Sequence, residues 1–363
     1  MTVANPAIKS TSERVLVTGG CGFLGCNIAA GLAARGRSVL AMDNLSRPGS
    51  EENADWLRQR YGNQVAIEVA DTRDTEAVDA LVSASTAVMH LAAQVAVTTS
   101  LDDPISDFEI NGRGTLNVLE AIRRHNPHAP MVFASTNKVY GKLLEDSRVH
   151  RVDGRYVPDE PRFQHGVRED TPLDLYSPYG CSKGAADQYV RDYARVFELR
   201  SVVLRMSCIY GPRQFGNEDQ GWIAHFLLQA IRHRPITIYG DGHQVRDALF
   251  VDDAVNAWIG ALDQIDGLAG RIFNLGGGPC NAISLRELLG FITELRGKPS
   301  EVRFAGWRPG DQPWYVSDIR AASQALEWQP QVPVRQGLQR IERWLDSQVN
   351  AATAASGLLE AGI

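Results

Sequence analysis

The sequence predicts an α/β protein in which helices cover both faces of a mostly parallel sheet. Short β-branched runs alternate with longer amphipathic runs from residue 14 to about residue 210, a pattern typical of βαβ units. The strand-like runs are almost wholly apolar, as expected of strands buried on both faces. From Gly211 onward Pro and Gly cluster, and helix-like runs follow. This change in composition predicts a second, smaller α/β lobe.

The predicted elements follow one another in a regular order. A strand over 14–19 leads into a helix over 24–36, and strands over 38–43, 65–70 and 87–92 come next. A helix over 111–125 precedes a strand over 131–135, and a helix over 182–198 precedes a strand over 200–207. In the second lobe we expect helices over 252–264 and 284–297. The apolar run 271–277 resembles another buried strand and is expected to return to the first domain.

These elements divide the chain into two lobes. Residues 14–210 form the predicted first domain and residues 211–349 mainly the second, while 1–13 and 350–363 lack a clear period and are expected to be loosely ordered. Within the first domain, residues 142–175 are rich in charge and Pro and show little periodicity. A long insert of this kind is either a functional lid or a solvated excursion of the surface. The sequence leaves both alternatives open.

Composition narrows the class of function. The 363 residues carry a formal charge of -6 without a basic face, so no nucleic-acid partner is expected. Five cysteines without a CxxC pair fit a reducing compartment better than a disulfide framework. No signal peptide and no apolar run of membrane-spanning length is visible, so we expect a cytoplasmic protein with no membrane partner. No set of residues has metal-ligand spacing, and no metal is predicted.

A glycine-rich turn links the first strand to the first helix. Gly19, Gly22 and Gly25 allow a tight turn, let backbone N–H groups approach a pyrophosphate and pack the helix closely on the sheet, as in a Rossmann-type domain. Asp43 ends the second strand, where its carboxylate can accept hydrogen bonds from a ribose and would repel a 2′-phosphate. NAD is therefore favoured over NADP, although Arg47 lies close by in the sequence. The predicted cofactor set also includes Phe23, Leu24, Asn44, Ser46, Arg47, Asp71, Thr72, Leu91, Ala92, Ala93 and Gln94, together with Asn111, Tyr179 and Lys183.

Two residues at strand ends have competing interpretations. Asp71, which follows the third strand, is predicted to bind the adenine amino group, but it could equally be the N-cap of the next helix. His90 ends the fourth strand, and we interpret it as a packed core histidine rather than a catalyst.

Tyr179 and Lys183 are four residues apart and share one face of the predicted helix. A tyrosine that acts as a base near neutral pH needs its pKa lowered from about 10, and a nearby ammonium and a nicotinamide cation would lower it. Such a pair is a weak signal alone, but it gains weight from the glycine turn upstream and the Ser/Thr strand end between them.

With these motifs, the chain resembles the extended short-chain dehydrogenase/reductases that act on nucleotide sugars, over about residues 14–345. The resemblance implies that Thr136 hydrogen-bonds the sugar oxygen, that Tyr179 is the acid/base and that Lys183 holds the nicotinamide ribose. Asn111 occupies the position of a structural asparagine in the cofactor half. Many members of the family form homodimers through two helices, here those that start near Asn111 and Tyr179.

The stretch STNKVYG, residues 135–141, then narrows the chemistry. The family's dehydratases carry Asp-Glu after the catalytic Thr, whereas this chain has Asn137 and Lys138. Elimination of water needs a carboxylic acid and a base, so the dehydration machinery is missing. Reversible oxidation of a carbinol remains, and it leads to epimerisation. STNKVYG and several other stretches resemble the subgroup of CDP-paratose 2-epimerases, also called CDP-tyvelose epimerases, which implies a CDP-sugar substrate.

The resemblance also implies a nucleotide end of the site. Arg246 and Arg308 can each make bidentate contacts to a diphosphate, and Tyr239 and Gln244 lie in the same stretches. Cys208 stands where related 4-epimerases have an asparagine, and it is expected to be a wall of the sugar pocket. Asn137 and Lys138 complete the predicted substrate set. The alternatives are a UDP-sugar 4-epimerase, a dehydratase or decarboxylase, and a nucleotide-binding protein without catalysis.

Overall fold

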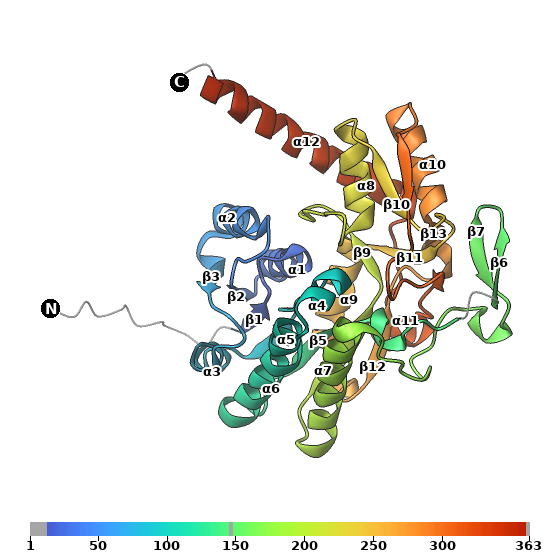
Figure 1. Cartoon of the computed structure of the whole chain (residues 1–363). Coiled ribbons are helices and arrows are strands. Elements are labelled where there is room, and N and C mark those ends of the chain that lie inside the picture. Colours follow the sequence, from blue (N-terminus) through green and yellow to red (C-terminus); the bar gives the residue numbers. More distant parts are fainter. Residues whose placement is uncertain (1–12, 145–147, 361–363) are drawn as a thin grey trace.

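A seven-stranded parallel sheet forms the centre of the protein (Figure 1). The computed structural model describes residues 13–144 and 148–360, with side chains up to residue 350. The strand order is β12-β8-β5-β4-β1-β2-β3. The strands are β1 (Arg14–Thr18), β2 (Ser38–Asp43), β3 (Val65–Val69), β4 (Ala87–His90), β5 (Met131–Thr136), β8 (Ser201–Met206) and β12 (Ile272–Leu275). The predicted α/β class is confirmed.

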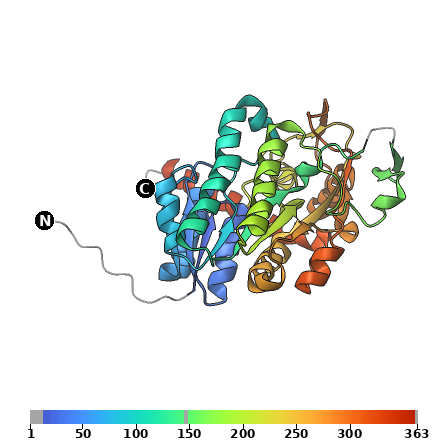
Figure 2. The ribbon, with the colours of Figure 1, turned by 90° about the horizontal axis from the view of Figure 1, so that it is seen from below.

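Helices cover both faces of this sheet, and successive strand residues serve opposite faces. In β1, Val15 and Val17 pack toward α1 and α9, whereas Leu16 packs toward α3, α6 and α7. Figure 2 shows the two helical layers on either side of the strands. The helices are α1 (Phe23–Ala34), α2 (Ser50–Tyr61), α3 (Thr75–Ser83), α4 (Val97–Asp102), α5 (Pro104–Phe108), α6 (Gly114–His125), α7 (Ser177–Val196) and α9 (Val251–Asp263). A π-helical turn, η2 (Glu109–Arg113), joins α5 to α6.

The C-terminal half builds a smaller lobe beside the carboxyl ends of the central strands. Its strands are β9 (Cys208–Tyr210), β10 (Ile236–Tyr239), β11 (Val245–Phe250), β13 (Ala282–Ser284), β14 (Val302–Ala305) and β15 (Trp314–Tyr315). Its helices are α8 (Trp222–Ile231), α10 (Leu285–Arg296), α11 (Arg320–Leu326) and α12 (Val334–Glu360). Strand β12 belongs to this half of the sequence, but it lies in the first sheet, parallel to β8.

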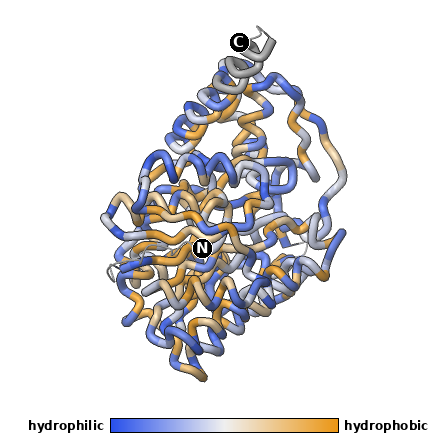
Figure 3. Tube along the Cα trace, turned by 90° about the vertical axis from the view of Figure 1, so that its left-hand side faces the viewer, coloured by the Kyte–Doolittle hydropathy of each residue, from blue (hydrophilic) through white to orange (hydrophobic). Residues whose placement is uncertain are grey.

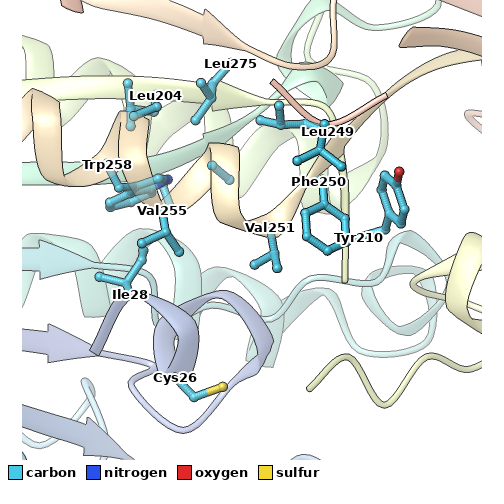
Figure 4. Packing of buried hydrophobic residues seen from close by; sticks show 14 of the residues in the cluster. Cys26, Ile28, Leu204, Tyr210, Leu249, Phe250, Val251, Val255, Trp258 and Leu275 are labelled. Carbon is cyan, nitrogen blue, oxygen red and sulfur yellow. The ribbon is translucent and has the colours of Figure 1, made fainter. Parts of the chain in front are cut away.

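One continuous apolar core joins the two lobes. Trp258 and Val255 of α9 lie between Ile28 of α1 and Leu204 of β8, and Phe250 and Tyr210 extend the core into the smaller lobe (Figure 4). Trp258, Ile28 and Leu204 are fully buried. In Figure 3 the apolar colour follows the central strands, while the outer turns of the helices are hydrophilic. Because the core is shared, the two halves of the cavity between the lobes are held on one packed body.

The insert over 142–175 contains an antiparallel hairpin, although the sequence shows little periodicity there. Strands β6 (Val149–Val152) and β7 (Arg155–Pro158) are joined by Asp153 and Gly154, which both have positive φ. An Asp-Gly pair of this kind is a strong hairpin signal. The hairpin contacts the smaller lobe, where the backbone N–H of Tyr156 donates to the carbonyl of His243 and Arg155 pairs with Glu287.

The two ends differ from each other. The predicted loose start lies outside the described residues up to residue 12. Helix α12 continues to Glu360, through a segment that the sequence predicts to be loose, and the alanines at 351, 352, 354 and 355 are strong helix formers. Within the described ranges, no helix is both long and apolar enough to cross a membrane.

Candidate active site

A cavity of about 710 Å³ opens at the carboxyl ends of the central strands, between the sheet and the smaller lobe. Parallel α/β sheets commonly bind ligands at this edge. Of the residues predicted as cofactor, catalytic or substrate contacts, all but Asn111 line this cavity. The structure therefore brings together positions from residue 19 to residue 308.

The glycine turn lies at one end of the cavity and fits a pyrophosphate closely. A Cβ on Gly19, which has a φ of +67°, would lie 2.8 Å from the backbone N of Ala92, and a Cβ on Gly25 would lie 2.0 Å from the carbonyl O of Gly19. Helix α1 begins here with Gly22 as its N-cap, without a side-chain cap or an acidic residue in its first turn. The first N–H groups of α1 are thus left for an anion.

Asp43 fixes the shape of this turn. Its Oδ2 accepts hydrogen bonds from the backbone N–H groups of Cys21 (3.0 Å) and Gly22 (3.1 Å), and its Oδ1 accepts one from Leu45 (2.9 Å). The carboxylate lines the cavity and retains lone pairs, since each carboxylate oxygen has two acceptor sites. Asp43 therefore supports the glycine turn in addition to its predicted contact with ribose.

Asp71 is not the N-cap of the following helix, because Asp74 caps α3 through the N–H groups of Glu76 and Ala77. Asp71 instead accepts hydrogen bonds from Asn44 Nδ2 (2.8 Å) and from Arg73, both from its backbone and from its guanidinium. These contacts, first that with the Arg73 side chain, hold the pKa of Asp71 well below its ordinary value. Asp71 thus orders the cavity rim beside Asn44, and its predicted contact with adenine stays a prediction.

Thr136, Tyr179 and Lys183 meet in the middle of the cavity. Thr136 ends β5, and Tyr179 and Lys183 lie in the first two turns of α7, which starts at Ser177 rather than at residue 182. The Thr136 hydroxyl lies close enough to Tyr179 to lower the pKa of its phenol, and the Lys183 Nζ lies 4.4 Å from the centre of the Phe133 ring. A hydroxyl, a phenol and an ammonium are thereby held together from two elements.

Burial perturbs both titratable members of this group. Loss of solvation raises the pKa of Tyr179 to about 12, while the hydrogen bond from Thr136 and the charge of Arg47 act in the opposite direction. Loss of solvation also lowers the pKa of Lys183 to about 8, although Asp187 and Asp107 favour its charged form. A tyrosine base in this site therefore needs a further positive charge from bound ligands.

Asn137 and Lys138 line the cavity next to Thr136. Thr136 Oγ1 lies 3.4 Å from Asn137 Oδ1, and the Lys138 Nζ donates to the Gly310 carbonyl at 3.1 Å. Burial lowers the pKa of Lys138, and nearby Asp311 opposes this. Cys208 forms part of the wall, where its Sγ accepts a hydrogen bond from the Trp222 indole at 3.4 Å.

The two arginines predicted to bind the diphosphate share their guanidinium groups with carboxylates. Arg246 is buried and contacts Asp311 Oδ1 at 2.5 Å. The Arg308 guanidinium lies 3.8 Å from the centre of the Tyr239 ring and 3.3 Å from Asp219 Oδ1. A diphosphate that binds here must compete with these carboxylates for the guanidinium N–H groups.

Several acceptor atoms around the cavity are buried without a hydrogen-bond partner. They are Oε1 of Gln94, Gln214 and Gln244 and Oγ1 of Thr98, all on side chains that line it. Buried polar atoms are usually paired. Because these atoms expose almost no surface, a ligand can pair with them only after their side chains turn toward the cavity.

Some observed features differ from the predictions or were not anticipated. Asn111 is fully buried behind the cavity, because its side chain links Gln94 N, Asp107 and Ser182 across the helix packing. His90 is also fully buried, and its ring nitrogens contact Thr18 and Thr115. The loop over 214–221, which contributes Gln214, Asn217, Glu218, Asp219 and Gln220 to the cavity, has no periodic signal in the sequence.

Comparison with known proteins assigns this arrangement to a family. The family model described as the NAD dependent epimerase/dehydratase family matches residues 15–276. The chain belongs to this family. The CDP-paratose 2-epimerase of Salmonella typhi is 42% identical over 92% of this chain and 99% of its own length. The UDP-glucose 4-epimerase of Mycolicibacterium smegmatis is 33% identical over 90% of this chain and 96% of its own length.

Solved structures of the family agree with this assignment. The UDP-glucose 4-epimerase of Thermus thermophilus, in complex with NAD, is 34% identical with a TM-score of 0.77 over 92% of this chain and 99% of that one. The UDP-glucuronic acid 4-epimerase of Bacillus cereus is 26% identical with a TM-score of 0.80 over the same shares. The predicted family, Rossmann-like fold and NAD cofactor are confirmed, and the protein is an NAD-dependent enzyme of the epimerase group.

Proposed function

We propose that the protein inverts C2 of a CDP-hexose of the CDP-paratose and CDP-tyvelose type. The observation that carries this proposal is that Thr136, Tyr179 and Lys183 line one cavity together with Asn137 and Lys138. By the family resemblance, Asn137 and Lys138 stand where dehydratases have Asp and Glu. The Salmonella typhi relative supports the choice of nucleotide and carbon.

The acidic side chains that line the cavity also disfavour dehydration. They are Asp43, Asp71, Glu218, Asp219 and Asp311. Asp43 and Asp71 accept hydrogen bonds around the glycine turn and the rim, Glu218 accepts one from Tyr239, and Asp219 and Asp311 pair with arginines. Elimination of water needs a carboxylic acid that is free to protonate the departing hydroxyl, and each of these five carboxylates is already engaged by the partners named above.

The mechanism follows from the groups on both sides of the sugar. When bound, NAD⁺ supplies reversible redox chemistry at the sugar carbon. The Tyr179 oxygen takes the proton from the C2 hydroxyl and later returns it, and Thr136 orients that hydroxyl. Lys183 provides a buried positive charge on the same helix face. The 2-keto sugar turns within the cavity between the two transfers, while Arg246 and Arg308 hold the diphosphate.

The insert over 142–175 packs behind the strand end that carries Asn137 and Lys138. Leu144 and Phe163 of the insert are buried and pack with Val139 and Tyr140, which directly follow Asn137 and Lys138 in the chain. None of the described residues of the insert lines the cavity, so we infer that the insert supports the position of Asn137 and Lys138.

NMR of the sugar ring protons in D₂O tests this proposal. The purified protein is incubated in turn with CDP-, UDP-, GDP- and dTDP-sugars, with Tyr179→Phe as the inactive control. Inversion at C2 of a CDP-sugar without solvent deuterium is the expected result. Inversion at C4 of a UDP-sugar would move the assignment to the 4-epimerases, which the 33% and 34% identical relatives make the second candidate. Loss of water or solvent deuterium at a ring carbon would contradict the argument from Asn137 and Lys138.

We also infer a homodimer formed through α5, η2, α6 and α7. Large apolar side chains are exposed on this face: Ile105 at 77%, Phe108 at 52% and Tyr189 at 47%. Patches of this kind mark interaction sites. Analytical ultracentrifugation should show a dimer that Ile105→Glu together with Phe108→Glu converts to a monomer; a monomeric parent protein would refute the inference. The cytoplasmic location stays a prediction from the sequence.

A further inference from the structure

Asp107, in the last turn of α5, is a buried carboxylate beside the catalytic helix. It is only 1% exposed. Its Oδ2 accepts a hydrogen bond from Ser182 Oγ, and its Oδ1 accepts one from Asn111 Nδ2 at 3.1 Å. Both donors are neutral, and among the described residues no arginine, lysine or histidine forms a salt bridge with it. An ionised carboxylate without a cationic partner is costly to bury. The presence of an aspartate at this buried position therefore suggests a functional role.

A second buried carboxylate, Asp187, provides the contrast. It lies one turn after Lys183 on α7 and is fully buried. Arg205 contacts both of its oxygens, at 2.9 and 3.0 Å, and Ser135 Oγ donates to it at 2.6 Å. The charge of Asp187 is therefore matched by that of Arg205. Asp107 has no such partner among the described residues, and after Asp187 it is the second carboxylate that favours the charged form of Lys183.

The charged groups around Lys183 come from several elements. Asp187 on α7 and Asp107 on α5 favour its ammonium form, while burial opposes it and leaves its pKa at about 8. His90 on β4 has a pKa lowered by burial to about 3, so its ring is neutral at physiological pH. Phe133 on β5 places its ring against the ammonium. Tyr179 also feels Asp107, which adds to the rise in its pKa, whereas Thr136 and Arg47 oppose that rise.

The π-helical turn η2 places a second contact on the same carboxylate. Turns of this kind are often found at functional sites. Asn111 in this turn donates to Asp107 and to Ser182 Oγ (3.1 Å), while its Oδ1 accepts from the backbone N of Gln94 in the cavity wall (2.9 Å). Asp107 thus lies at the centre of a network that joins α5, the catalytic turn of α7 and the cofactor side of the cavity.

We propose that Asp107 is a positioning residue for the reaction: it fixes the turn between Tyr179 and Lys183 through Ser182 and, together with Asp187, supplies negative charge that balances the Lys183 ammonium. The proposal rests on the proposed function in taking Lys183 as catalytic. It does not depend on which sugar or carbon the enzyme uses.

The test compares Asp107→Asn with the parent protein and with Glu109→Gln, which removes a half-exposed carboxylate from the same segment. Competitive acetylation of Lys183 with acetic anhydride, followed by mass spectrometry across a pH series, gives the midpoint of its titration. We expect Asp107→Asn to lower this midpoint by about 1 pH unit, the smaller end of the effect of a nearby charge. Glu109→Gln should leave it unchanged. An unchanged midpoint in folded Asp107→Asn would overturn the proposal.

The pH profile of kcat separates this role from a purely structural one. Removal of a negative charge lowers the pKa values of both Tyr179 and Lys183, so both limbs of the profile should move to lower pH. A structural defect would reduce the maximum and leave the limbs in place, and that result would also overturn the proposal. Asp107→Glu, which keeps the charge, should restore the limbs. If Asp107→Asn does not fold, Asp107→Ser removes the carboxylate and leaves room for a water on Ser182. The titration of Lys183 can be measured even if the protein epimerises no CDP-sugar. The role of Asp107 and the proposed 2-epimerase activity can therefore be refuted independently.

Discussion

Replacement of Lys183 by methionine should make the protein more stable and inactive. Lys183 is 3% exposed, and its amine loses solvation that the unfolded chain retains. Methionine has a similar length without a charge and can keep the contact with the Phe133 ring. The substitution therefore removes an electrostatic cost while it leaves the packing of α7 on β5 nearly unchanged.

The size of the effect follows from the pKa of Lys183. A pKa shift of one unit corresponds to about 1.4 kcal/mol, so the fall in the pKa of Lys183 from 10.5 to about 8 costs the folded protein about 3 kcal/mol. The substitution also removes the contact between the ammonium and the Phe133 ring, and this loss offsets about 0.5–1 kcal/mol of the stabilisation. The folded pKa lies below the unfolded one, so the penalty is complete below about pH 8 and disappears as the pH approaches 10.5. We expect a gain of about 2–3 kcal/mol at pH 7 that shrinks steadily toward pH 10.

Urea unfolding of nucleotide-free protein at pH 7.0, 8.5 and 9.5 measures this difference. Bound NAD must be removed first, because a ligand of the folded state stabilises it by mass action. Lys298→Met is the matched control, since Lys298 is exposed and its replacement should change stability by less than about 0.5 kcal/mol. A gain that is the same at every pH, or a less stable Lys183→Met, would refute the reasoning from the buried ammonium.

Three further predictions concern the turn, the buried ion pair and the acid/base. Gly25→Ala should lower the NAD content of purified protein severalfold and cost about 1–3 kcal/mol on thermal unfolding, because its Cβ meets a backbone oxygen; Gly290→Ala, with nothing near its Cβ, is the control. Arg205→Met should cost about 3–5 kcal/mol in urea unfolding because it leaves Asp187 buried without a cation, and Asp187→Asn added to it should recover most of that loss; no recovery would refute the pairing argument. Tyr179→Phe should reduce turnover at least about 10²-fold with NAD still bound, and activity within tenfold of the parent would remove Tyr179 from the acid/base role.

The sequence predicts the parts of this protein that depend on local chemistry. The glycine turn, the strand ends at Asp43 and Thr136, and the spacing of Tyr179 and Lys183 each follow from a few neighbouring residues. Because carboxyl ends of parallel strands meet at one edge, these distant motifs could be expected in one cavity. The structure places them there.

The remaining features depend on contacts between distant residues. Asp107 contacts Ser182 across 75 residues, and nothing in the spacing of either residue marks that pair. Arg246 pairs with Asp311, 65 residues later, and no local pattern in the sequence predicts this pair either. The N-cap at Asp74 had a local signal that Asp71 shared, because both residues are of the N-cap type. The hairpin at Gly154 had a clear signal, the one Asp-Gly pair of the insert, although no hairpin was predicted there.

The arrangement of charges explains why this site needs a shared core beneath it. A buried ammonium at Lys183 and a carboxylate without a salt bridge at Asp107 both oppose folding, and the side-chain oxygens of Gln214 and Gln244 are buried without partners. Such costs persist only where the surrounding packing is strong enough to hold the groups in place. The core around Trp258 continues from α1 through β8 into the smaller lobe, so the packing that offsets these costs also fixes the distance between the cofactor and substrate ends of the cavity. Ligands that contact both ends of the cavity should therefore stabilise both lobes together.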